Sequence, residues 1–257
     1  MRPVLPDTFT TVPLAHRALH DRAQGRPENS AQAVRAAVAA GYGIEVDVQI
    51  SADGVAMVFH DDTLDRLTDA TGPVTALTAA ALQQIGLRDS AEPIPTLAQV
   101  LEIIAGRVPL LIELKDQSGI MGPTNGQLEQ ATAQALAGYQ GPVAVMSFNP
   151  SMIRTMARIA PQIPRGLTTY AFPQSDFPQT DAAEVHRRHL AAITDFDDVA
   201  ASFISHDWKD LQNPRVASLK EAGAKILCWT IKSPDQEALA RRVAQNITFE
   251  QYLPHIP

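Results

Sequence analysis

The feature that most constrains the fold is a regular alternation of short apolar strands with amphipathic helices along nearly the whole chain. Strand-like runs begin at Val12, Gly43, Pro109, Val143, Arg165, Ser202, Lys225 and Asn246. Helix-like segments cover 31–40, 97–105, 127–137, 152–159, 181–189, 214–222 and 234–243. A helix that joins two neighbouring strands leaves them parallel, because it crosses from one end of the sheet to the other. The sequence therefore predicts an α/β protein whose eight parallel strands close into a (β/α)8 barrel, the TIM barrel.

Three segments depart from this alternation. Residues 51–93 hold a turn at Asp53-Gly54, a strand that can pair back on its neighbour and a short helix, which predicts a small insertion after strand two. Only residues 251–257 follow the last strand, so we expect a truncated eighth helix. Residues 1–11 are rich in Pro and Thr and are expected to be irregular. We expect 1–257 to form a single catalytic TIM-barrel domain, because such barrels commonly use about 250 residues.

An open, doubly wound sheet is the alternative fold. Sheets of that kind commonly place a glycine-rich phosphate loop directly after the first strand. The segment after the first predicted strand contains neither a G-x-G-x-x-G nor a P-loop pattern. The barrel is therefore the preferred interpretation.

Composition narrows the classes of function. The 257 residues have a formal net charge of −7, which argues against non-specific binding to nucleic acid or to anionic membranes. No run approaches the roughly 18 apolar residues of a membrane span, and 1–7 lacks the apolar stretch of a secretory signal. We expect a cytoplasmic protein without stable membrane insertion, and assembly into a homo-oligomer stays open. The single cysteine, Cys228, lies in an apolar strand and is expected in the core.

The strand Gly43–Ile50 has the most informative chemical pattern. Its apolar residues alternate with Glu45, Asp47 and Gln49, so the period of two puts both carboxylates on one face. Unpaired carboxylates on an inner face are costly unless they share a cation, and hard divalent metals prefer oxygen ligands. We interpret the strand as part of a metal site. The alternative is an edge strand whose carboxylates face water.

The ends of other predicted strands are also polar. His16-Arg17 closes the first strand, His60 closes the hairpin beyond the second, and Glu113 and Lys115 lie on the third. In (β/α)8 barrels, functional residues gather where strands end. A third carboxylate would suit Mg²⁺ or Ca²⁺, while Arg17 and Lys115 would attract a phosphate. Two histidines that flank a phosphate suit general acid–base catalysis, whereas a lone strand-end histidine is usually a hydrogen-bonded core or loop residue.

These residues belong to short blocks spread from residue 16 to residue 230. The blocks are His16-Arg17-Ala18, Pro27-Glu28-Asn29, Glu45-Val46-Asp47, Asp53-Gly54, 60–68, Glu113-Leu114-Lys115, Ser147-Phe148 and Trp229-Thr230. In this order the set resembles the glycerophosphodiester phosphodiesterase family. The resemblance implies a barrel with an insertion after strand two. It also implies hydrolysis of a glycerophosphodiester, a small-molecule substrate, to glycerol 3-phosphate and an alcohol.

The resemblance also implies a role for individual residues. His16 and His60 would form the acid–base pair. One divalent metal, Mg²⁺ or Ca²⁺, would be held by Glu45, Asp47 and Glu113. Substrate would be bound by Arg17, Lys115, Glu28, Asn29, Phe148 and Trp229, with Glu28 and Asn29 supporting the first loop.

Two positions depart from the family pattern. Ala18 replaces the usual glycine, which implies strain if its φ is positive. The family commonly closes on a strand ending Ile-Thr-Asp, whereas Ile247-Thr248 is followed here by Phe249 and Glu250, which shifts the acid by one residue. Any role for this last carboxylate is therefore an open question.

Several other groups allow two interpretations each. Tyr170, Phe172 and Phe177 could join Phe148 and Trp229 in an aromatic wall for a quaternary ammonium such as choline, or the last two could be core residues. The glycine-rich loop after Lys115 is either a mobile lid or a long exposed connection. His206-Asp207 is either a substrate contact or structural support. A solvated helix face is expected at His186 and His189, and a solvated loop at Asp195, Asp197 and Asp198.

Three other functions remain as alternatives to the phosphodiesterase. A lysophospholipase-D-like enzyme would use the same residues but would need an apolar entrance for an acyl chain. A catalytically silent barrel could bind phosphorylated ligands, although the intact histidines and carboxylates argue against it. A sugar-phosphate isomerase shares the fold but not the paired histidines, so the site rather than the fold must decide.

Overall fold

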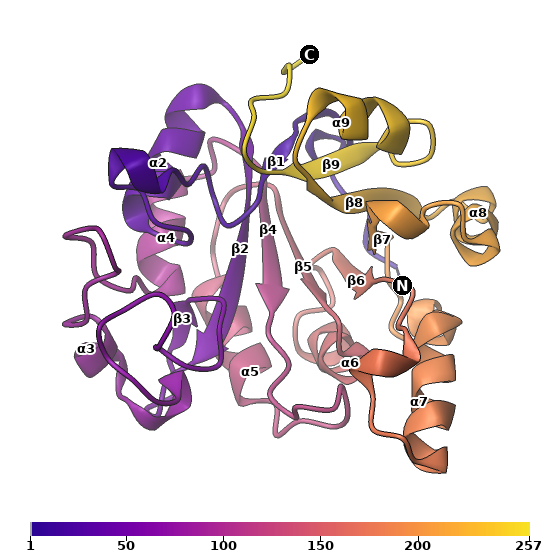
Figure 1. Cartoon of the computed structure of the whole chain (residues 1–257), viewed down its shortest axis with the longest axis horizontal. Coiled ribbons are helices and arrows are strands. Elements are labelled where there is room, and N and C mark those ends of the chain that lie inside the picture. Colours follow the sequence, from indigo (N-terminus) through magenta and orange to yellow (C-terminus); the bar gives the residue numbers. More distant parts are fainter. Residues whose placement is uncertain (1) are drawn as a thin grey trace.

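Eight parallel strands form a closed barrel in the computed structural model, which describes residues 2–257 (Figure 1). They are β1 (Leu14–Ala15), β2 (Gly43–Ile50), β4 (Leu110–Leu114), β5 (Val143–Ser147), β6 (Arg165–Thr169), β7 (Phe203–Asp207), β8 (Lys225–Ile231) and β9 (Asn246–Phe249). The two-residue strand β1 pairs with both β2 and β9, which closes the ring. The predicted (β/α)8 barrel is therefore confirmed.

Helices surround this barrel and begin and end at residues that favour helix termini. The longer ones are α2 (Ala31–Ala40), α4 (Leu97–Ile104), α5 (Gln127–Ala135), α6 (Pro150–Ile159), α7 (Asp181–Ala191), α8 (Pro214–Glu221) and α9 (Pro234–Ala240). The Ser30 hydroxyl accepts from the third residue of α2, and Gly41 ends that helix with a φ of 78°. Helices α6, α8 and α9 each start with proline, which needs no hydrogen-bond acceptor at that position. Short 3-10 turns occur at η1 (Arg22–Gln24), η3 (Gln174–Asp176), η4 (Thr194–Phe196) and η5 (Trp208–Asp210).

The alternation of side chains along β2 separates two environments. Ile44, Val46 and Val48 are fully buried in the main apolar cluster, which lies between the barrel and its helices. Helices α2 and α4 lie side by side outside β2 (Figure 1). Glu45 and Asp47 point the other way, toward the inside of the barrel, because successive side chains of a strand face opposite sides. The inward carboxylates predicted from the period of two are therefore present.

Apolar side chains fill the barrel interior beneath these carboxylates. The interior cluster consists of Leu5, Phe9, Leu14, Leu111, Ala144, Met146, Phe203 and Leu227. Phe9 comes from a helical turn, α1 (Thr8–Thr11), and the Asn246 side-chain amide donates to its carbonyl at 2.8 Å. The prediction that 1–11 is irregular is thus wrong for 8–11, and Met1 lies outside the described residues. The sequence did not predict this turn, because it is held in place by one buried aromatic residue, Phe9, and not by a helical repeat of apolar residues.

The predicted insertion follows β2 and has an apolar cluster of its own. The strand β3 (Ala56–Val58) runs antiparallel to β2, and η2 (Val74–Ala76) and α3 (Ala79–Leu82) follow it. The cluster comprises Met57, Phe59, Leu64, Leu67, Val74, Ala79, Leu82, Leu87 and Ile94. At the other end of the chain, no helix follows β9 within the described residues. The tail docks instead through the Tyr42 hydroxyl, which donates to the Pro254 carbonyl at 2.7 Å. The predicted insertion is therefore confirmed, and the place of the expected truncated eighth helix is taken by a non-helical tail.

Gly166 on β6 allows the ring of Phe203 to fill the barrel interior. A Cβ at Gly166 would lie 2.4–2.6 Å from three atoms of that ring. We expect Gly166→Ala to lower the free energy of unfolding by about 1–3 kcal/mol, because overpacking forces the ring or the strand to move. Urea denaturation followed by circular dichroism measures the change. Gly86→Ala is the matched control, since its nearest neighbour would lie 3.9 Å away. Equal stability of the two variants would contradict this explanation of the packing.

Candidate active site

Three carboxylates meet on the inner faces of the neighbouring strands β2 and β4. Asp47 and Glu113 are partners in the parallel register, and Glu45 lies on the same face of β2. One oxygen from each carboxylate lies within 4.8 Å of the other two. All three residues are buried, with exposed fractions of 2% for Glu45, 2% for Asp47 and 7% for Glu113. A compact set of three carboxylate oxygens is the kind of donor set that hard divalent cations prefer.

Lys115 and Arg17 supply positive charge beside these carboxylates. The Lys115 Nζ lies 2.8 Å from a Glu113 oxygen and 3.5 Å from an Asp47 oxygen. The Arg17 Nε lies 3.7 Å from Asp47, and the Arg17 backbone N–H donates to Glu45 at 2.8 Å. Both cations therefore lie beside the carboxylates, in the positions expected from the sequence.

Glu28 and Asn29 hold the loop that contains Arg17. The Arg17 guanidinium donates to Glu28 at 2.6 Å, and the Asn29 amide donates to Asp47 at 3.0 Å. Arg66, from the insertion, donates to the same Glu28 carboxylate at 2.8 and 2.9 Å. Burial raises the pKa of Glu28, but the contacts with Arg66 and Arg17 outweigh it and leave the pKa lowered. Glu28 therefore contacts the site indirectly, by holding Arg17, and Asn29 contacts it by donating a hydrogen bond to Asp47.

The pKa values of the carboxylates differ because their partners differ. Burial raises the pKa of Asp47, but Lys115, His60 and Arg17 outweigh it and bring it to about 2. The pKa of Glu45 is raised by burial and by the negative charges of Asp47 and Glu113, which outweigh the backbone hydrogen bond from Arg17 and the charge of its guanidinium. A divalent cation bound among these oxygens would remove that repulsion, so the residues present fit a metal ion.

The two predicted histidines each form a hydrogen bond to a carboxylate through Nδ1. His16 Nδ1 lies 2.7 Å from a Glu250 oxygen, and His60 Nδ1 lies 2.6 Å from an Asp61 oxygen. An ionised carboxylate only accepts hydrogen bonds, so Nδ1 of each ring is the donor. Nε2 of each ring is then the atom left to exchange a proton with a substrate.

Glu250 reaches the candidate site, although the sequence left its role undecided. Its carboxylate contacts His16 and also lies 2.7 Å from the Lys232 ammonium, and the hydrogen bond to His16 is the main cause of its lowered pKa. The acid displaced by one residue from the family pattern therefore still reaches the first histidine. In the sequence, the only sign of this role was the acidic residue one position later than in the family pattern, after Thr248 and Phe249. For His16 itself, burial lowers the pKa and outweighs the opposing effect of Glu250.

Asp61 and Arg66 form the corresponding support on the other side. Arg66 donates to Asp61 at 2.6 and 2.7 Å while it also contacts Glu28. Burial raises the pKa of Asp61, but Arg66 and His60 outweigh it and lower it to about 2. Neither residue was predicted as part of the site, although both lie in the 60–68 block. One guanidinium therefore ties the loop that holds Arg17 to the loop that holds His60.

These side chains line a cavity of about 210 Å³. Its lining residues are His16, Arg17, Glu45, Asp47, His60, Glu113, Lys115, Met146, Phe148, Trp229, Thr230 and Thr248. The rings of Phe148 and Trp229 form one wall, with centroids 5.5 Å apart and planes at 83°. All predicted site residues except Glu28 and Asn29 therefore line one cavity, which we call the catalytic cavity.

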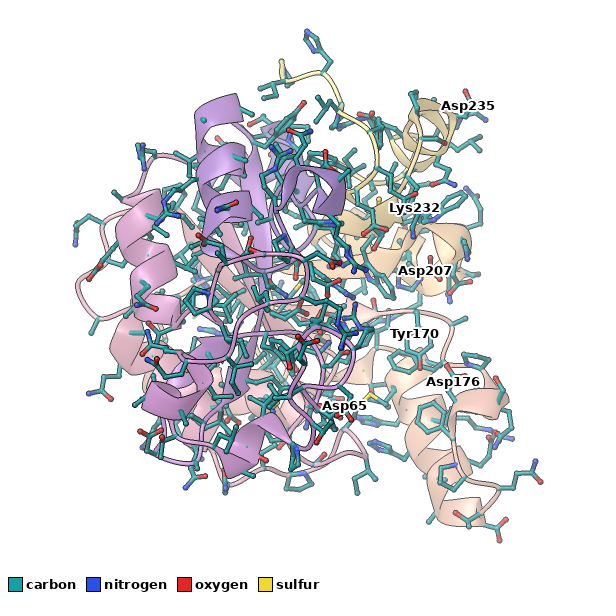
Figure 2. The ribbon with its side chains drawn as sticks, turned by 60° about the vertical axis from the view of Figure 1, so that its left-hand side comes forward. Asp65, Tyr170, Asp176, Asp207, Lys232 and Asp235 are labelled. Carbon is teal, nitrogen blue, oxygen red and sulfur yellow. The ribbon has the colours of Figure 1, made fainter. Side chains whose placement is uncertain are left out.

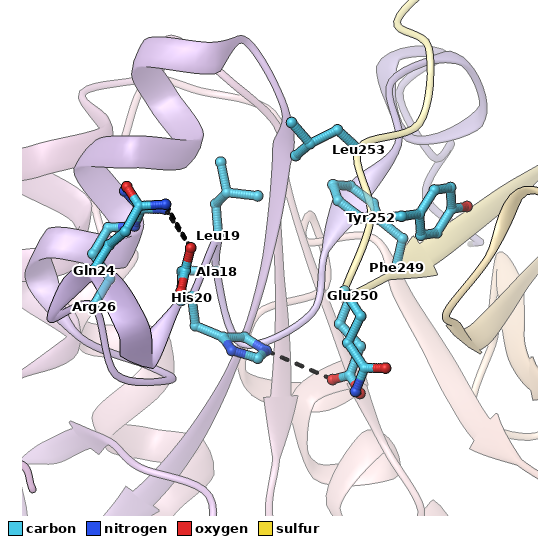
Figure 3. A pocket seen from close by; sticks show the side chains of 11 residues that line it. Ala18, Leu19, His20, Gln24, Arg26, Phe249, Glu250, Tyr252 and Leu253 are labelled. Atoms are coloured by element: carbon cyan, nitrogen blue, oxygen red, sulfur yellow. Dashed lines mark hydrogen bonds and ion pairs between the residues drawn. The ribbon is translucent and has the colours of Figure 1, made fainter. Parts of the chain in front are cut away.

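A second groove of about 470 Å³ lies behind Glu250, between the first loop and the chain end (Figure 3). The His20 Nε2 lies 3.6 Å from Glu250, and Leu19 and Tyr252 contribute to the apolar side of the groove. The groove shares none of its lining residues with the catalytic cavity. Glu250 therefore separates the two spaces.

Other residues singled out in the sequence have structural contacts. His206 is fully buried between the Thr169 hydroxyl at 2.8 Å and Asp210 at 3.1 Å, and it lines neither the catalytic cavity nor the groove. The predicted solvated loop is wrong for Asp195, which is 7% exposed and bonded to Arg154 at 2.7 Å. His189 also hydrogen-bonds to Asp195 rather than only facing water. The ion pair between Arg154 and Asp195 could not be predicted from the sequence, because Arg154 lies on α6, 41 residues before Asp195.

Ala18 has the conformation that the family's glycine would allow. Its φ is 64°, and its N–H donates to the Glu45 carbonyl at 2.9 Å. A non-glycine residue in this region costs roughly 1–2 kcal/mol. The expectation of strain at Ala18 therefore holds, and the close approach of the first loop to β2 is retained.

Residues 16–246 match the model of the Glycerophosphoryl diester phosphodiesterase family. A glycerophosphodiester phosphodiesterase of Caldanaerobacter subterraneus is 32% identical over 166 residues, which are 61% of this chain and 66% of that protein. The Bacillus subtilis protein YhdW, whose name suggests the same activity, is 27% identical over 243 residues, covering 91% of this chain and 90% of that one.

Solved structures resemble the fold over almost the whole chain. An Oleispira antarctica phosphodiesterase, solved with the product sn-glycerol-3-phosphate, is 26% identical with a TM-score of 0.72 and covers 93% of this chain and 92% of that one. A structure from Agrobacterium tumefaciens, with a TM-score of 0.75 at 20% identity and 93% coverage of each chain, supports the fold alone.

The barrel and its site define a phosphoric diester hydrolase. Because the family match takes in nearly the whole chain, the chain belongs to the glycerophosphoryl diester phosphodiesterase family. The resemblance noted from the sequence blocks is thereby confirmed.

The three carboxylates predict a stability that depends on divalent metal. At a hundredfold excess over its dissociation constant, a ligand of the native state adds about 2.7 kcal/mol, or roughly 5–10 °C in melting temperature for a chain of this size. We expect Mg²⁺ or Ca²⁺ to raise the melting temperature of the wild type but not of Glu45→Gln, measured by differential scanning fluorimetry.

The variant Glu45→Gln also tests the repulsion between Glu45 and the carboxylates of Asp47 and Glu113. In EDTA, Glu45→Gln should melt at a higher temperature than the wild type, because it removes the carboxylate whose pKa is raised. The exposed Glu221→Gln serves as control in both conditions. A metal response that survives Glu45→Gln would contradict the site.

The Glu250–His16 contact predicts that Glu250 positions the imidazole. Glu250→Gln should lower kcat at least about tenfold with little change in KM, because the neutral amide no longer favours the required tautomer. The pH profile of kcat/KM should also shift, because Glu250 raises the pKa of His16 and its loss moves the His16 limb to lower pH. Glu250→Asp should recover part of the rate. An unchanged profile in Glu250→Gln would show that the contact has no role in catalysis.

Proposed function

We propose that the catalytic cavity hydrolyses a glycerophosphodiester to glycerol 3-phosphate and an alcohol, with His16 and His60 as the acid–base pair and one divalent metal, Mg²⁺ or Ca²⁺, as cofactor. The observation that supports this most strongly is the convergence in one cavity of two histidines, each with Nδ1 on a carboxylate, and three clustered carboxylates. The solved Oleispira antarctica relative contains the corresponding product, sn-glycerol-3-phosphate.

The cations of the cavity are suited to hold the phosphate. Arg17 lines the cavity beside Asp47, so its guanidinium is suited to attract a phosphate oxygen. Lys115 lies beside Glu113 and Asp47 and adds a second positive charge. A metal ion held by Glu45, Asp47 and Glu113 would supply further stabilisation of the negative charge that develops on the phosphate.

The histidines move the protons. The neutral imidazole accepts the proton of the nucleophile at Nε2, and the protonated imidazole donates its Nε2 proton to the oxygen of the leaving alcohol. Glu250 and Asp61 keep each Nδ1 protonated and stabilise the imidazolium that forms. The same arrangement serves a water molecule or the glycerol 2-hydroxyl as nucleophile.

Other expectations from the sequence stay predictions. None of the helices within residues 2–257 combines the length and the apolar composition that a membrane span requires. The cytoplasmic location and the absence of a nucleic-acid partner stay proposals, and assembly into a homo-oligomer stays open. The lysophospholipase-D-like activity and the silent barrel are outcomes that the following assay separates.

The assay is release of glycerol 3-phosphate from glycerophosphocholine, in EDTA and after Mg²⁺ or Ca²⁺ is restored. We expect metal-dependent turnover, and a loss of about 10²–10⁴-fold in His16→Ala and His60→Ala, the usual contribution of a general acid or base. His255→Ala, on the exposed tail, is the matched control. Turnover of lysophosphatidylcholine alone would instead favour the lysophospholipase alternative, and metal binding without any turnover would favour the silent barrel.

A further inference from the structure

We propose that a second cavity, which opens from the catalytic cavity and which we call the outer cavity, binds the alcohol part of the substrate and selects a positively charged one. The class of ligand is a small quaternary or primary ammonium alcohol esterified to the phosphate. This inference rests on the proposed function, because it concerns the other half of the same phosphodiester.

The outer cavity continues directly from the catalytic cavity. It has a volume of about 490 Å³, and the two cavities share Glu113, Lys115, Phe148 and Trp229 as lining residues. A phosphodiester whose phosphate lies beside the carboxylates can therefore extend one substituent into the outer cavity. The groove behind Glu250 is of similar size but has no shared lining residue, so it does not offer this continuity (Figure 3).

Aromatic rings form one side of the outer cavity. The ring of Phe148 lies between Trp229 at 5.5 Å and Tyr170 at 5.8 Å, nearly perpendicular to both, with interplanar angles of 83° and 82°. Phe172 is buried and packs on Tyr170 at a centroid distance of 4.1 Å, which fixes the position of that ring. Aromatic faces attract ammonium groups through their quadrupoles. The aromatic wall considered from the sequence is thus assembled from Phe148, Tyr170 and Trp229.

Three carboxylates line the same cavity and have only neutral hydrogen-bond donors. Asp62 accepts from the Gln49 amide at 3.0 Å. Asp116 accepts from the Asn149 amide at 2.8 Å and from backbone N–H groups of its own loop. Asp176 accepts from the Tyr170 hydroxyl at 3.0 Å. Among residues 2–257, none of these three carboxylates lies within ion-pair distance of a lysine, arginine or histidine.

The contrast with the catalytic cavity indicates the sign of the ligand. Lys115 is the only cationic residue lining the outer cavity, and it is already paired with Glu113 and Asp47. With a divalent metal among its carboxylates, the catalytic cavity would present positive charge to an anionic phosphate. The outer cavity presents unneutralised carboxylates to the next group along the substrate. A neutral polyol would gain hydrogen bonds there but would leave the negative charge uncompensated, whereas an ammonium group compensates it.

The Tyr170–Asp176 pair holds one side of this cavity in place. Tyr170 follows the end of β6, Asp176 is the last residue of η3, and Figure 2 shows both side chains on the orange part of the chain. On the opposite side, Asp116 anchors the loop after β4 through the backbone N–H of Met121 at 2.8 Å. The carboxylates are therefore fixed by neutral bonds within the protein, and binding an ammonium group requires no rearrangement of an existing ion pair.

The test compares kcat/KM for glycerophosphocholine and glycerophosphoglycerol, whose alcohol is neutral. We expect the wild type to favour the choline ester, and Asp176→Asn and Tyr170→Leu each to lower the ratio of the two kcat/KM values about tenfold. Asp176→Asn keeps an acceptor for the Tyr170 hydroxyl, so it removes charge without removing the contact. Asp69→Asn, whose side chain is 97% exposed on the insertion, should leave the ratio unchanged.

A second measurement separates charge from shape. Tetramethylammonium should inhibit hydrolysis of glycerophosphoglycerol competitively, and the neutral tert-butanol of similar shape should not. Equal use of both diesters, or a ratio that Asp176→Asn leaves unaltered, would overturn the inference while the proposed function stands. If neither diester is hydrolysed with metal present, the proposed function itself fails.

Discussion

Repulsion among the buried carboxylates of Glu45, Asp47 and Glu113 is the constraint on which the rest of this structure depends. Their oxygens lie within 4.8 Å of one another inside the barrel, where like charges interact strongly. Lys115 and Arg17 lie against these carboxylates and offset part of the repulsion, and the Arg17 backbone N–H donates a further hydrogen bond to Glu45. The insertion and the first loop are in turn needed to hold Arg17. A divalent metal would complete the same balance, so the proposed mechanism and the stability of the barrel would depend on one group of residues.

Charge is divided between two adjoining cavities. In the catalytic cavity, Lys115 and Arg17 lie against the carboxylates, and two imidazoles are oriented by Glu250 and Asp61. In the outer cavity, the carboxylates of Asp62, Asp116 and Asp176 are held by neutral donors. An anionic phosphate and a cationic alcohol would each find opposite charge. The two halves of a zwitterionic diester would thereby be placed by electrostatics, and the rings of Phe148, Tyr170 and Trp229 would contact the ammonium group.

The fold and the inner half of the site could be predicted because they depend on local periodicity. Alternation along β2 decides which side chains face the barrel interior, and the parallel register with β4 then places Asp47 beside Glu113. The helical turn at Thr8–Thr11 and the buried pair of Arg154 with Asp195 were missed. Neither leaves a repeating pattern of apolar residues in the sequence, because each is held by a contact between residues that are far apart along the chain.

By itself, the sequence determined the alternation of strands and helices, the face of each carboxylate and the two histidines at strand ends. Only the tertiary structure decided that Glu250 orients His16, a contact between residues 234 positions apart. That contact exists because the ring closes between β1 and β9, which brings the first and last strands side by side. Sequence spacing indicates which residues share an element, whereas barrel closure decides which elements meet.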